Sequence, residues 1–458
     1  MTPQAAQATT RDDPADQPLV VVTATAPTPN GPLHVGHLAG PFIAADVAAR
    51  AARARGARTL TVSGLDPHQN YVCTKAASQG RQVTEVLDEY ETLVRQALGA
   101  ARIGYDVFND PRADQDYRDR VGLLLDELAA RGMVVTERTT LTRCSRCGTT
   151  LHHAYVSGDC ARCGLVSSGG TCEACGAFAS AENLGGARCA RCGGSAEPFT
   201  ADIPLLRLES WRAELSACWS GAVMPARVRS LIGHYLACGL PDVPLAYPTD
   251  WGISAGGDGN RVDVWVEMGL GLITGIGRRL DPAASGLDQC AAAWRQVGEW
   301  WHFLGIDNAF YFAILFPGLF AAAGIDPSRL GGLVVNEFYQ LDGLKFSTSR
   351  GHAVWAHEFL EQEDPATVRM YVCWDRPDRF ESGFTRDAYA EFRNWIAAAL
   401  ADGGTLPPGL AAAEARRAGH ALEFGTFDPG LALRCLLAAG PGRATAVLGA
   451  LTGDDAAP

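Results

Sequence analysis

Residues 27–37, Pro27-Thr28-Pro29-Asn30-Gly31-Pro32-Leu33-His34-Val35-Gly36-His37, stand between a short β-branched run at 19–24 and a long Ala-rich stretch at 35–55. The apolar run predicts a buried strand, and the Ala-rich stretch predicts a helix that begins after the Pro/Gly/Asn loop. A second strand candidate at 59–63 (TLTVS) is followed by two more helical stretches, at about 83–98 and 113–131. Strands that alternate with helices predict an α/β fold with a parallel sheet.

The loop at 27–37 is also the first candidate site. In a doubly wound sheet, ligands bind at the carboxyl ends of the strands, and the N-terminus of the following helix attracts phosphate. His34 and His37 are three residues apart on the first turn and face the same way, and Gly36 between them leaves room for a flat ligand. A His-x-x-His pair alone is equally compatible with two surface histidines.

A second chemical motif lies far down the chain. Residues 342–351 (DGLKFSTSRG) form a Gly-flanked, hydroxyl-rich basic loop. A loop of this kind can close over a triphosphate.

Composition narrows the class of protein. The 458 residues carry 39 Lys and Arg against 51 Asp and Glu, a net charge of −12, which argues against bulk electrostatic binding of nucleic acid. The apolar runs are shorter than the roughly 18 residues that a membrane-spanning helix needs. Residues 1–17 are polar, acidic and without an apolar signal core, so we expect a disordered tail on a cytoplasmic protein that makes no membrane contact.

Eight of the 14 cysteines form four Cys-x-x-Cys pairs. Each pair brings two thiolates to one side of a tight turn, so four turns predict two four-thiolate zinc sites. A disulfide framework is the alternative, but it is typical of small secreted chains. All-cysteine sites leave no open coordination position, which favours structural zinc. The strands entering and leaving the segment must run side by side, so the pairs should nest. The inner site would be Cys160, Cys163, Cys172 and Cys175, and the outer site Cys144, Cys147, Cys189 and Cys192. The other six cysteines are expected to be buried apolar thiols.

HVGH early, KFSTS late and the Cys-rich segment between them resemble the HIGH and KMSKS motifs and the zinc insertion of class I aminoacyl-tRNA synthetases, and among these the methionyl-tRNA synthetase family. Residues 64–68 (GLDPH), 264–267 (VWVE) and 302–307 (HFLGID) match further motifs of that family in order and spacing. The resemblance covers about residues 18–400. It implies a Rossmann-type catalytic domain that forms an aminoacyl-adenylate from ATP, with Mg²⁺ as the counter-ion of the phosphates.

The resemblance also implies roles for single residues. His34 and His37 would hold the ATP phosphates, and Lys345, Ser347 and Ser349 would stabilise the charge that develops on them. Asp66 would pair with the α-ammonium of the amino acid. The remaining positions are Asn30, Gly36, Gly305 and Asp307 for ATP, and Ala26, Thr28, Trp265, Leu272 and Phe312 for the amino acid.

Several positions depart from the family pattern. The second lysine of KMSKS is Thr348 here, and the lysine of the HFIGKD-type motif is Ile306, so two cations that would face phosphate are missing, although Arg350 could compensate. The methionine pocket is rebuilt at Ala26, Thr28, Leu272 and Phe312. The His-Gly that usually precedes the KMSKS strand reads Asn336-Glu337. A pocket with changed walls should prefer a side chain other than methionine.

The domain plan that follows has five parts: a tail at 1–17, the first half of the catalytic domain at 18–138, the zinc-knuckle insertion at 139–198, the second half with the KMSKS-like loop at 199–384, and a C-terminal helical region at 385–458. The last part is Ala- and Gly-rich, with few aromatic residues and no basic cluster beyond Arg416-Arg417. We therefore expect the tRNA-reading domain to be truncated or degenerate.

Three functions remain open. The first is a ligase that activates an amino acid and transfers it to a small hydroxyl, hydroxylamine or amine without tRNA, as in the similar synthetase-like domains of hydrazine-forming enzymes in natural-product biosynthesis, where a cupin or another pathway enzyme would be the partner. The second is a divergent but genuine methionine–tRNA ligase. The third is a non-catalytic paralogue that binds an amino acid. The sequence names neither the amino acid nor the acceptor.

Overall fold

The first strand, β1 (Leu19–Ala24), lies in the middle of a five-stranded parallel sheet of order β15-β14-β1-β2-β3. The structure, a computed structural model, describes residues 17–454 except 257–258, 347–350 and 405. The other strands of the sheet are β2 (Thr59–Gly64), β3 (Val107–Asn109), β14 (Val297–Gly305) and β15 (Leu330–Asn336). The chain moves outward from β1 to β2 and β3 on one side, and from β14 to β15 on the other. The switch in direction between β1 and β14 is where a parallel sheet offers a ligand crevice at its carboxyl edge.

Both faces of this sheet are covered, which is why its strands are continuous apolar runs. Val21 belongs to the apolar core on one face, together with residues of α5 and α8. Val22, the next residue, belongs to the core on the opposite face, together with residues of α2 and α12. The predicted parallel α/β fold is therefore confirmed, and its strand residues alternate between two cores.

The predicted helix at 35–55 is present but interrupted. It consists of α1 (Val35–His37), a π-helical turn η2 (Leu38–Phe42) and α2 (Ile43–Ala54). Pro41 lies inside the turn and has no N–H to donate, and Gly40 has a non-helical ψ of −122°. The interruption separates the histidine-bearing turn from the regular helix behind it.

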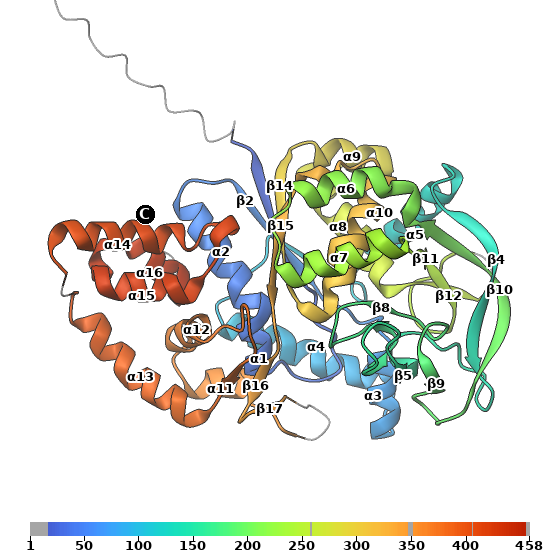
Figure 1. Ribbon diagram of the computed structural model, residues 1–458, viewed down its shortest axis with the longest axis horizontal. Helices are drawn as coiled ribbons and strands as arrows, with labels where there is room; N and C mark the ends of the chain where they lie inside the picture. The colour runs from blue at the N-terminus through green and yellow to red at the C-terminus, as the bar shows by residue number, and fades with distance from the viewer. Residues whose placement is uncertain (1–16, 257–258, 347–350, 405, 455–458) are drawn as a thin grey trace, which may run out of the picture.

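The remaining helices cover the sheet (Figure 1). In the first half they are α3 (Tyr71–Gln79), α4 (Val83–Ala100) and α5 (Gln115–Ala130). In the second half they are α6 (Arg212–Gly221), α7 (Ala226–Cys238), α8 (Val264–Leu280), α9 (Leu287–Trp294), the π-helical η6 (Tyr311–Leu315), α10 (Phe316–Ala322), α11 (Ala356–Gln362) and α12 (Pro365–Trp374). Short 3₁₀ turns are η3 (His153–Tyr155), η4 (Leu208–Trp211), η5 (Ile306–Asn308), η7 (Pro327–Arg329), η8 (Phe424–Thr426) and η9 (Pro441–Arg443).

The Cys-rich insertion leaves and rejoins the domain through two long antiparallel strands, β4 (Val135–Cys144) and β10 (Ala196–Arg207). Their pairing runs from Val135 opposite Leu205 to Cys144 opposite Ala196, so the arms extend beyond the expected boundaries of 139–198. Figure 1 shows them at the right-hand edge. The short strands of the insertion are β5 (Val156–Asp159), β6 (Val166–Ser168), β7 (Gly170–Thr171), β8 (Phe178–Ala179) and β9 (Gly185–Cys189). After the insertion come β11 (Asp242–Pro244), β12 (Ala246–Pro248) and β13 (Asn260–Val262).

After β15 the chain forms a small sheet and then the C-terminal helices. The sheet contains β16 (Tyr339–Leu341), β17 (Leu344–Lys345) and β18 (Ser382–Phe384). The helices are α13 (Arg386–Ala401), α14 (Pro408–His420), α15 (Pro429–Ala439) and α16 (Thr445–Thr452), drawn in red and orange on the left of Figure 1.

One buried arginine ties the C-terminal helices to the sheet domain. The guanidinium of Arg369, which is fully buried, lies 2.6 Å from the carboxylate of Asp46 on α2 and donates to the carbonyls of Ala450 and Leu451 on α16. A buried charge is tolerated when its donors are satisfied in this way. No helix of the described residues has the length and apolar character needed to cross a membrane.

Candidate active site

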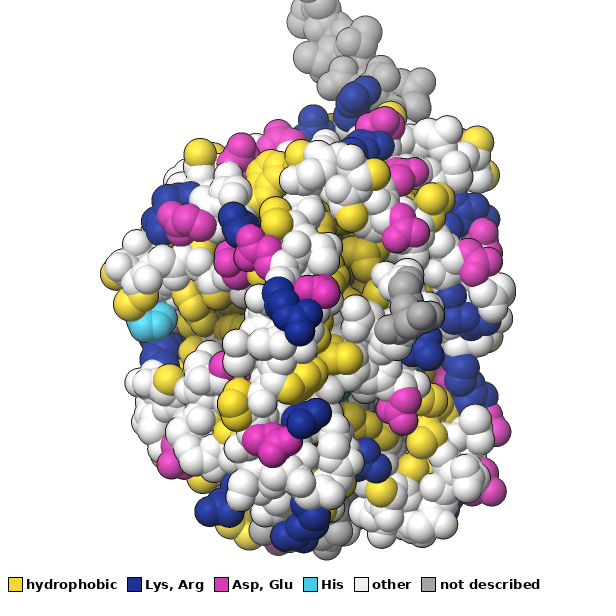
Figure 2. Space-filling model, turned by 90° about the vertical axis from the view of Figure 1, so that its right-hand side faces the viewer, with side chains coloured by type: hydrophobic (Ala, Val, Ile, Leu, Met, Phe, Trp, Pro, Cys, Tyr) yellow, Lys and Arg dark blue, Asp and Glu magenta, His cyan; other side chains and the backbone are white. Residues whose placement is uncertain are grey.

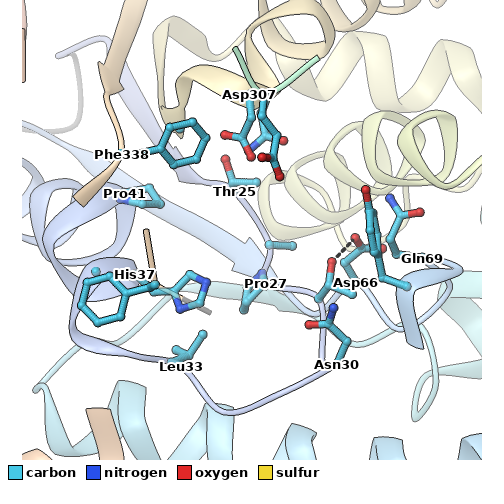
Figure 3. Close-up of a pocket in the computed structure, with 18 of the residues that line it drawn as sticks. Thr25, Pro27, Asn30, Leu33, His37, Pro41, Asp66, Gln69, Asp307 and Phe338 are labelled. Carbon is cyan, nitrogen blue, oxygen red and sulfur yellow. Dashed lines mark hydrogen bonds between the residues drawn. The ribbon is translucent and has the colours of Figure 1, made fainter. Parts of the chain in front are cut away.

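A cavity of about 400 Å³ opens at the carboxyl ends of β1, β14 and β15. Figure 3 shows His37, Asp66 and Asp307 reaching it from separate elements, namely α1, the loop after β2 and the turn after β14. Most of the predicted site residues that the structure describes line it: Ala26, Thr28, Asn30, His34, Gly36, His37, Asp66, Trp265, Gly305, Asp307 and Lys345. Residues 347–350, which include Ser347, Thr348, Ser349 and Arg350, lie outside the described part of the chain.

The two histidines form a stacked pair. Their ring centroids are 3.8 Å apart, and Phe346 stacks on the other side of His34 at 4.3 Å. The backbone N–H of His34 donates to Nδ1 of His37 at 3.1 Å. Burial lowers the pKa of His37 to about 4, and burial together with His37 lowers the pKa of His34 well below its ordinary value. Both rings are therefore neutral at pH 7, and the proton of His37 is on Nε2, where it can be donated to an oxygen anion.

Gly36 leaves space for the His34 and Phe346 rings because it has no side chain. A Cβ at this position would lie 3.0 Å from the His34 ring and 3.2 Å from Phe346. The side chains of His34 and Phe346 therefore occupy the space that we predicted for a flat ligand.

Asp66 is buried and presents a free oxygen to the cavity. The Thr28 hydroxyl donates to Oδ2 at 2.9 Å, while Oδ1 has no partner among the described residues. Burial raises the pKa of Asp66 well above its ordinary value; the Thr28 hydrogen bond opposes this, and the neighbouring charges of Glu267 and Asp263 add to it. A cation stabilises the ionised form of a buried carboxylate that lies near other carboxylates. An ammonium group has the required charge and hydrogen-bond donors.

The residues predicted to contact the amino-acid side chain divide between two cavities. Ala26, Thr28 and Trp265 line the main cavity. Leu272 and Phe312 line a second cavity of about 30 Å³ behind Ala26, which borders both. This small cavity is closed by the side chains of Tyr117, Met268 and Phe316 among others. Trp265 stacks flat on Tyr311 at 3.8 Å.

The turn after β14 brings another carboxylate into the cavity. Burial raises the pKa of Asp307 to about 6, and the nearby Glu173 carboxylate adds to the effect. A Cβ on Gly305 would lie 2.5 Å from Oδ1 of Asp307, so a larger residue here would displace this carboxylate.

Lys345 reaches the cavity from β17, but it is held by the zinc-knuckle insertion. Its ammonium pairs with the carboxylate of Glu173 and lies 4.8 Å from the centre of the Phe338 ring. The Lys345 side chain is half exposed, so this ion pair is worth about 1 kcal/mol or less and can be exchanged for a phosphate.

Both predicted metal sites are assembled. The sulfur atoms of each tetrad lie within 4.8 Å of one another, in the nested pairing that the sequence predicts. Cys144 and Cys192 approach to 3.4 Å, and Cys163 and Cys172 to 3.6 Å. A zinc ion with sulfur ligands at about 2.3 Å requires separations of this size. Of the other six cysteines, Cys218, Cys290, Cys373 and Cys435 are buried, but Cys238 is exposed and Cys73 is half-buried, which corrects our expectation for those two.

Each Cys-x-x-Cys turn ends on a glycine with φ between +70° and +73°: Gly148, Gly164, Gly176 and Gly193. Its N–H donates to the carbonyl of the first cysteine of its pair, for example Gly164 to Cys160 at 2.8 Å. Left-handed glycine closes the turn and leaves both sulfurs on the same side.

The sequence did not predict that the segment of the inner cysteine site, Cys160 to Cys175, contributes to the cavity. Ser168, Gly169, Gly170, Thr171 and Glu173 line it, and the Thr171 hydroxyl donates to the carbonyl of Asp307. His153 and Tyr71 line it as well. The sequence signals for these residues were the His152-His153 pair, which lies between two Cys-x-x-Cys pairs, and Glu173, which lies inside a third pair. Neither pattern indicates a site without knowledge of the fold.

Comparisons with known proteins identify the family of this chain. A model of the family "tRNA synthetases class I (M)" matches residues 20–402. Methionine–tRNA ligases from Methanobrevibacter smithii and Porphyromonas gingivalis are 28% and 29% identical to this chain over 391 and 404 residues, and each match covers 82% of this chain and 56% of the relative. The chain thus spans a little more than half the length of these relatives.

Solved structures show the same fold. A Mycobacterium tuberculosis methionyl-tRNA synthetase bound by methionyl-adenylate superimposes with a TM-score of 0.68 at 18% identity, covering 95% of this chain and 83% of that one. A second structure of that synthetase with methionyl-adenylate gives a TM-score of 0.69 at 18% identity.

Proposed function

The chain belongs to the class I tRNA synthetase (M) family, and we propose that it activates an amino acid as an aminoacyl-adenylate and passes it to a small-molecule acceptor without tRNA. The observation that carries the activation step is the convergence of neutral His37, Lys345, Asp66 and Asp307 on one cavity. In this arrangement, His37 and Lys345 would contact phosphate, Asp66 would contact the ammonium group, and Asp307 would contact the ribose.

In the proposed reaction, the α-ammonium pairs with Asp66 and the ribose hydroxyls bond to Asp307. The carboxylate of the amino acid then attacks the α-phosphate. A new P–O bond forms to a carboxylate oxygen, and the P–O bond between the α-phosphate and the pyrophosphate breaks. The Nε2–H of His37 and the ammonium of Lys345 donate to phosphate oxygens as their charge grows. Catalysis is then mostly positioning and charge stabilisation. Mg²⁺ on the ATP phosphates would add further neutralisation.

The zinc ions have a structural role in this proposal. The eight cysteines would hold two ions, and because the insertion has a small apolar core of its own, the metals would fix its shape. The inner site thereby positions residues 168–173 at the cavity.

The rebuilt pocket supports an amino acid other than methionine. The side cavity that Leu272 and Phe312 line has a volume of about 30 Å³, against about 400 Å³ for the main cavity. A small side chain fits this space without rearrangement, whereas a long thioether requires the aromatic walls to move.

Charge distribution supports the small acceptor. The chain is acidic overall, and on the face in Figure 2 the Lys and Arg side chains are interspersed with Asp and Glu and do not gather into one basic stretch. Binding of a polyanion depends on clustered cations. A natural-product pathway, with a cupin or other enzyme acting on the product, is the setting that we propose.

A second candidate function is a divergent methionine–tRNA ligase, and the 28–29% identity to such ligases favours it. Amino-acid-dependent exchange of labelled pyrophosphate into ATP, measured for each of the twenty amino acids, tests the proposal. We expect exchange with one small amino acid and little with methionine. Exchange with methionine alone would contradict the proposed specificity, and no exchange at all would leave a binding paralogue.

A further inference from the structure

His153 occupies an unusual position at the wall of the cavity. It follows the outer knuckle, begins η3, and has a φ of +45°, which few residues other than glycine adopt. Three hydrogen bonds hold the surrounding backbone in place: Asn70 Nδ2 to the His152 carbonyl, Ala154 N–H to Asn70 Oδ1, and Gly169 N–H to the His153 carbonyl. A strained conformation that is clamped in this way favours a role in function.

The ring of His153 is oriented by one carboxylate. Its Nε2 lies 2.6 Å from Oδ2 of Asp263, and both side chains are more than nine-tenths buried. Burial alone would raise the pKa of Asp263, but the charge that His153 carries when it is protonated and the hydrogen bonds from His153 and from the backbone N–H of Trp265 outweigh it and lower that pKa. The carboxylate is therefore ionised and accepts the proton of Nε2. In the neutral ring this leaves Nδ1 as a lone pair.

That lone pair has no protein partner. Among the described residues, none comes within hydrogen-bonding reach of His153 Nδ1. Gly170 leaves the space above it open, because a Cβ there would lie 2.9 Å from Nδ1. His153 lines the same 400 Å³ cavity as Asp66 and Trp265. A buried, unpartnered acceptor at a cavity wall calls for a donor from a ligand.

We propose that His153 is the general base of the transfer step, oriented by Asp263, and that it takes the proton of a hydroxyl, hydroxylamine or amine acceptor. This inference rests on the proposed function and deepens it. The acceptor heteroatom attacks the carbonyl carbon of the adenylate with its lone pair and forms the new C–O or C–N bond. The C–O bond to the phosphate breaks, AMP leaves with that electron pair, and the proton of the acceptor moves to Nδ1. The imidazolium that results faces the Asp263 carboxylate, which stabilises it, and later releases its proton to water.

The geometry distinguishes this step from adenylation. His34 and His37 lie on α1, whereas His153 lies on the insertion side of the cavity. Attack on the α-phosphate by a carboxylate needs no base, because the attacking group is already an anion. The removal of His153 should therefore slow transfer and spare adenylation.

The test separates the two half-reactions. In His153→Gln the side-chain amide can still donate to Asp263, but the base is lost. Adenylation is read by pyrophosphate exchange, and transfer by single-turnover decay of preformed enzyme-bound adenylate with N-methylhydroxylamine as the probe. We expect exchange within about twofold of the native rate and transfer slower by about 10²-fold or more. His152→Gln is the matched control, since the adjacent ring bonds to the Thr150 carbonyl and does not line the main cavity; both rates should be unchanged.

Asp263→Asn gives a second, spectroscopic readout. Oδ1 of Asp263 accepts the N–H of Trp265 at 2.9 Å, so the amide oxygen must stay there and turn its NH₂ toward His153. The proton of the ring then moves to Nδ1 and the base is lost, as ¹⁵N NMR of labelled histidine would show. The native protein should give the Nε2–H tautomer and the variant the Nδ1–H tautomer.

The outcomes divide clearly. Equal loss of exchange and transfer in His153→Gln, or no loss of transfer, overturns the inference while the proposed function stands. Absence of exchange in the native protein overturns the proposed function. A native Nδ1–H tautomer overturns the inference in either case.

Discussion

At the scale of the residue, the site depends on groups whose charge is controlled by burial. His37 is neutral and donates through Nε2, and Lys345 is the cation that reaches the same cavity from β17. If both act on charge that develops in the transition state, their loss should affect turnover more than ATP binding.

We therefore expect His37→Ala and Lys345→Ala each to lower the maximal rate of pyrophosphate exchange by about 10² to 10³-fold, with a much smaller change in the KM for ATP. The exchange assay at varied ATP concentration gives both quantities. Parallel losses in the two would mean that these side chains act as ordinary binding residues.

In our proposal, Asp66 makes amino-acid binding depend on pH. In the free protein, burial raises the pKa of Asp66 well above its ordinary value. The Thr28 hydrogen bond opposes this effect, and the charges of Glu267 and Asp263 add to it. Only the ionised form attracts an ammonium group. As pH falls through the raised pKa, the proton competes with the substrate, so the KM for the amino acid should rise.

The matched variant is Asp66→Asn, which cannot ionise. We expect its KM to be higher by about 10- to 10²-fold at neutral pH and nearly constant on acidification. Exchange kinetics between pH 5 and 8 would check this, and a native KM that does not change with pH would show that Asp66 does not hold the ammonium.

At the scale of the element, the insertion forms part of the wall of the cavity. Glu173 in the inner knuckle pairs with Lys345, and Arg227 joins Glu337 after β15 to the carbonyl of Ala174. We therefore expect the inner tetrad to position the wall of the cavity and the outer tetrad to hold the two arms of the hairpin together when they bind metal.

This difference predicts unequal effects of removing the two metals. Cys172→Ser should release one zinc of the two and slow adenylation by about 10²-fold, because residues 168–173 shift against the cavity. Cys189→Ser, the buried counterpart of Cys172 in the outer site, should also release one zinc but affect adenylation much less. Zinc analysis by mass spectrometry with exchange kinetics measures both, and equal losses of activity would contradict the assignment.

The sequence could predict the elements but not their assembly at the cavity. The β-branched run at 19–24 forms β1, and the four Cys-x-x-Cys pairs form two tetrads, as these local patterns predicted. His34, His37 and Lys345 of the two nucleotide motifs line one cavity, while residues 347–350 lie outside the described part of the chain. The contacts of His153 with Asp263 and of Lys345 with Glu173 join residues 110 and 172 positions apart. Such pairs depend on how the insertion docks, which no local pattern encodes. The interruption of the first helix was missed because Gly40 and Pro41 act within an otherwise good helical stretch.

At the scale of the whole molecule, the two halves of the sheet domain and the insertion line the main cavity, and the two halves of the sheet domain line a small side pocket. In our proposal this cavity binds ATP and an amino acid, and Nδ1 of His153, which has no partner among the described residues, receives the proton of the acceptor. We infer a small acceptor rather than a polyanion from the acidic overall charge and from the interspersed charges on the face in Figure 2.

The central claim is most directly tested by the rate at which the purified protein forms AMP from ATP and its amino acid, measured with total tRNA or with a small hydroxylamine as the acceptor. We predict that the hydroxylamine accelerates AMP formation and yields an aminoacyl product, and that tRNA adds nothing. Charging of tRNA with methionine under the same conditions would contradict the account and identify a methionine–tRNA ligase.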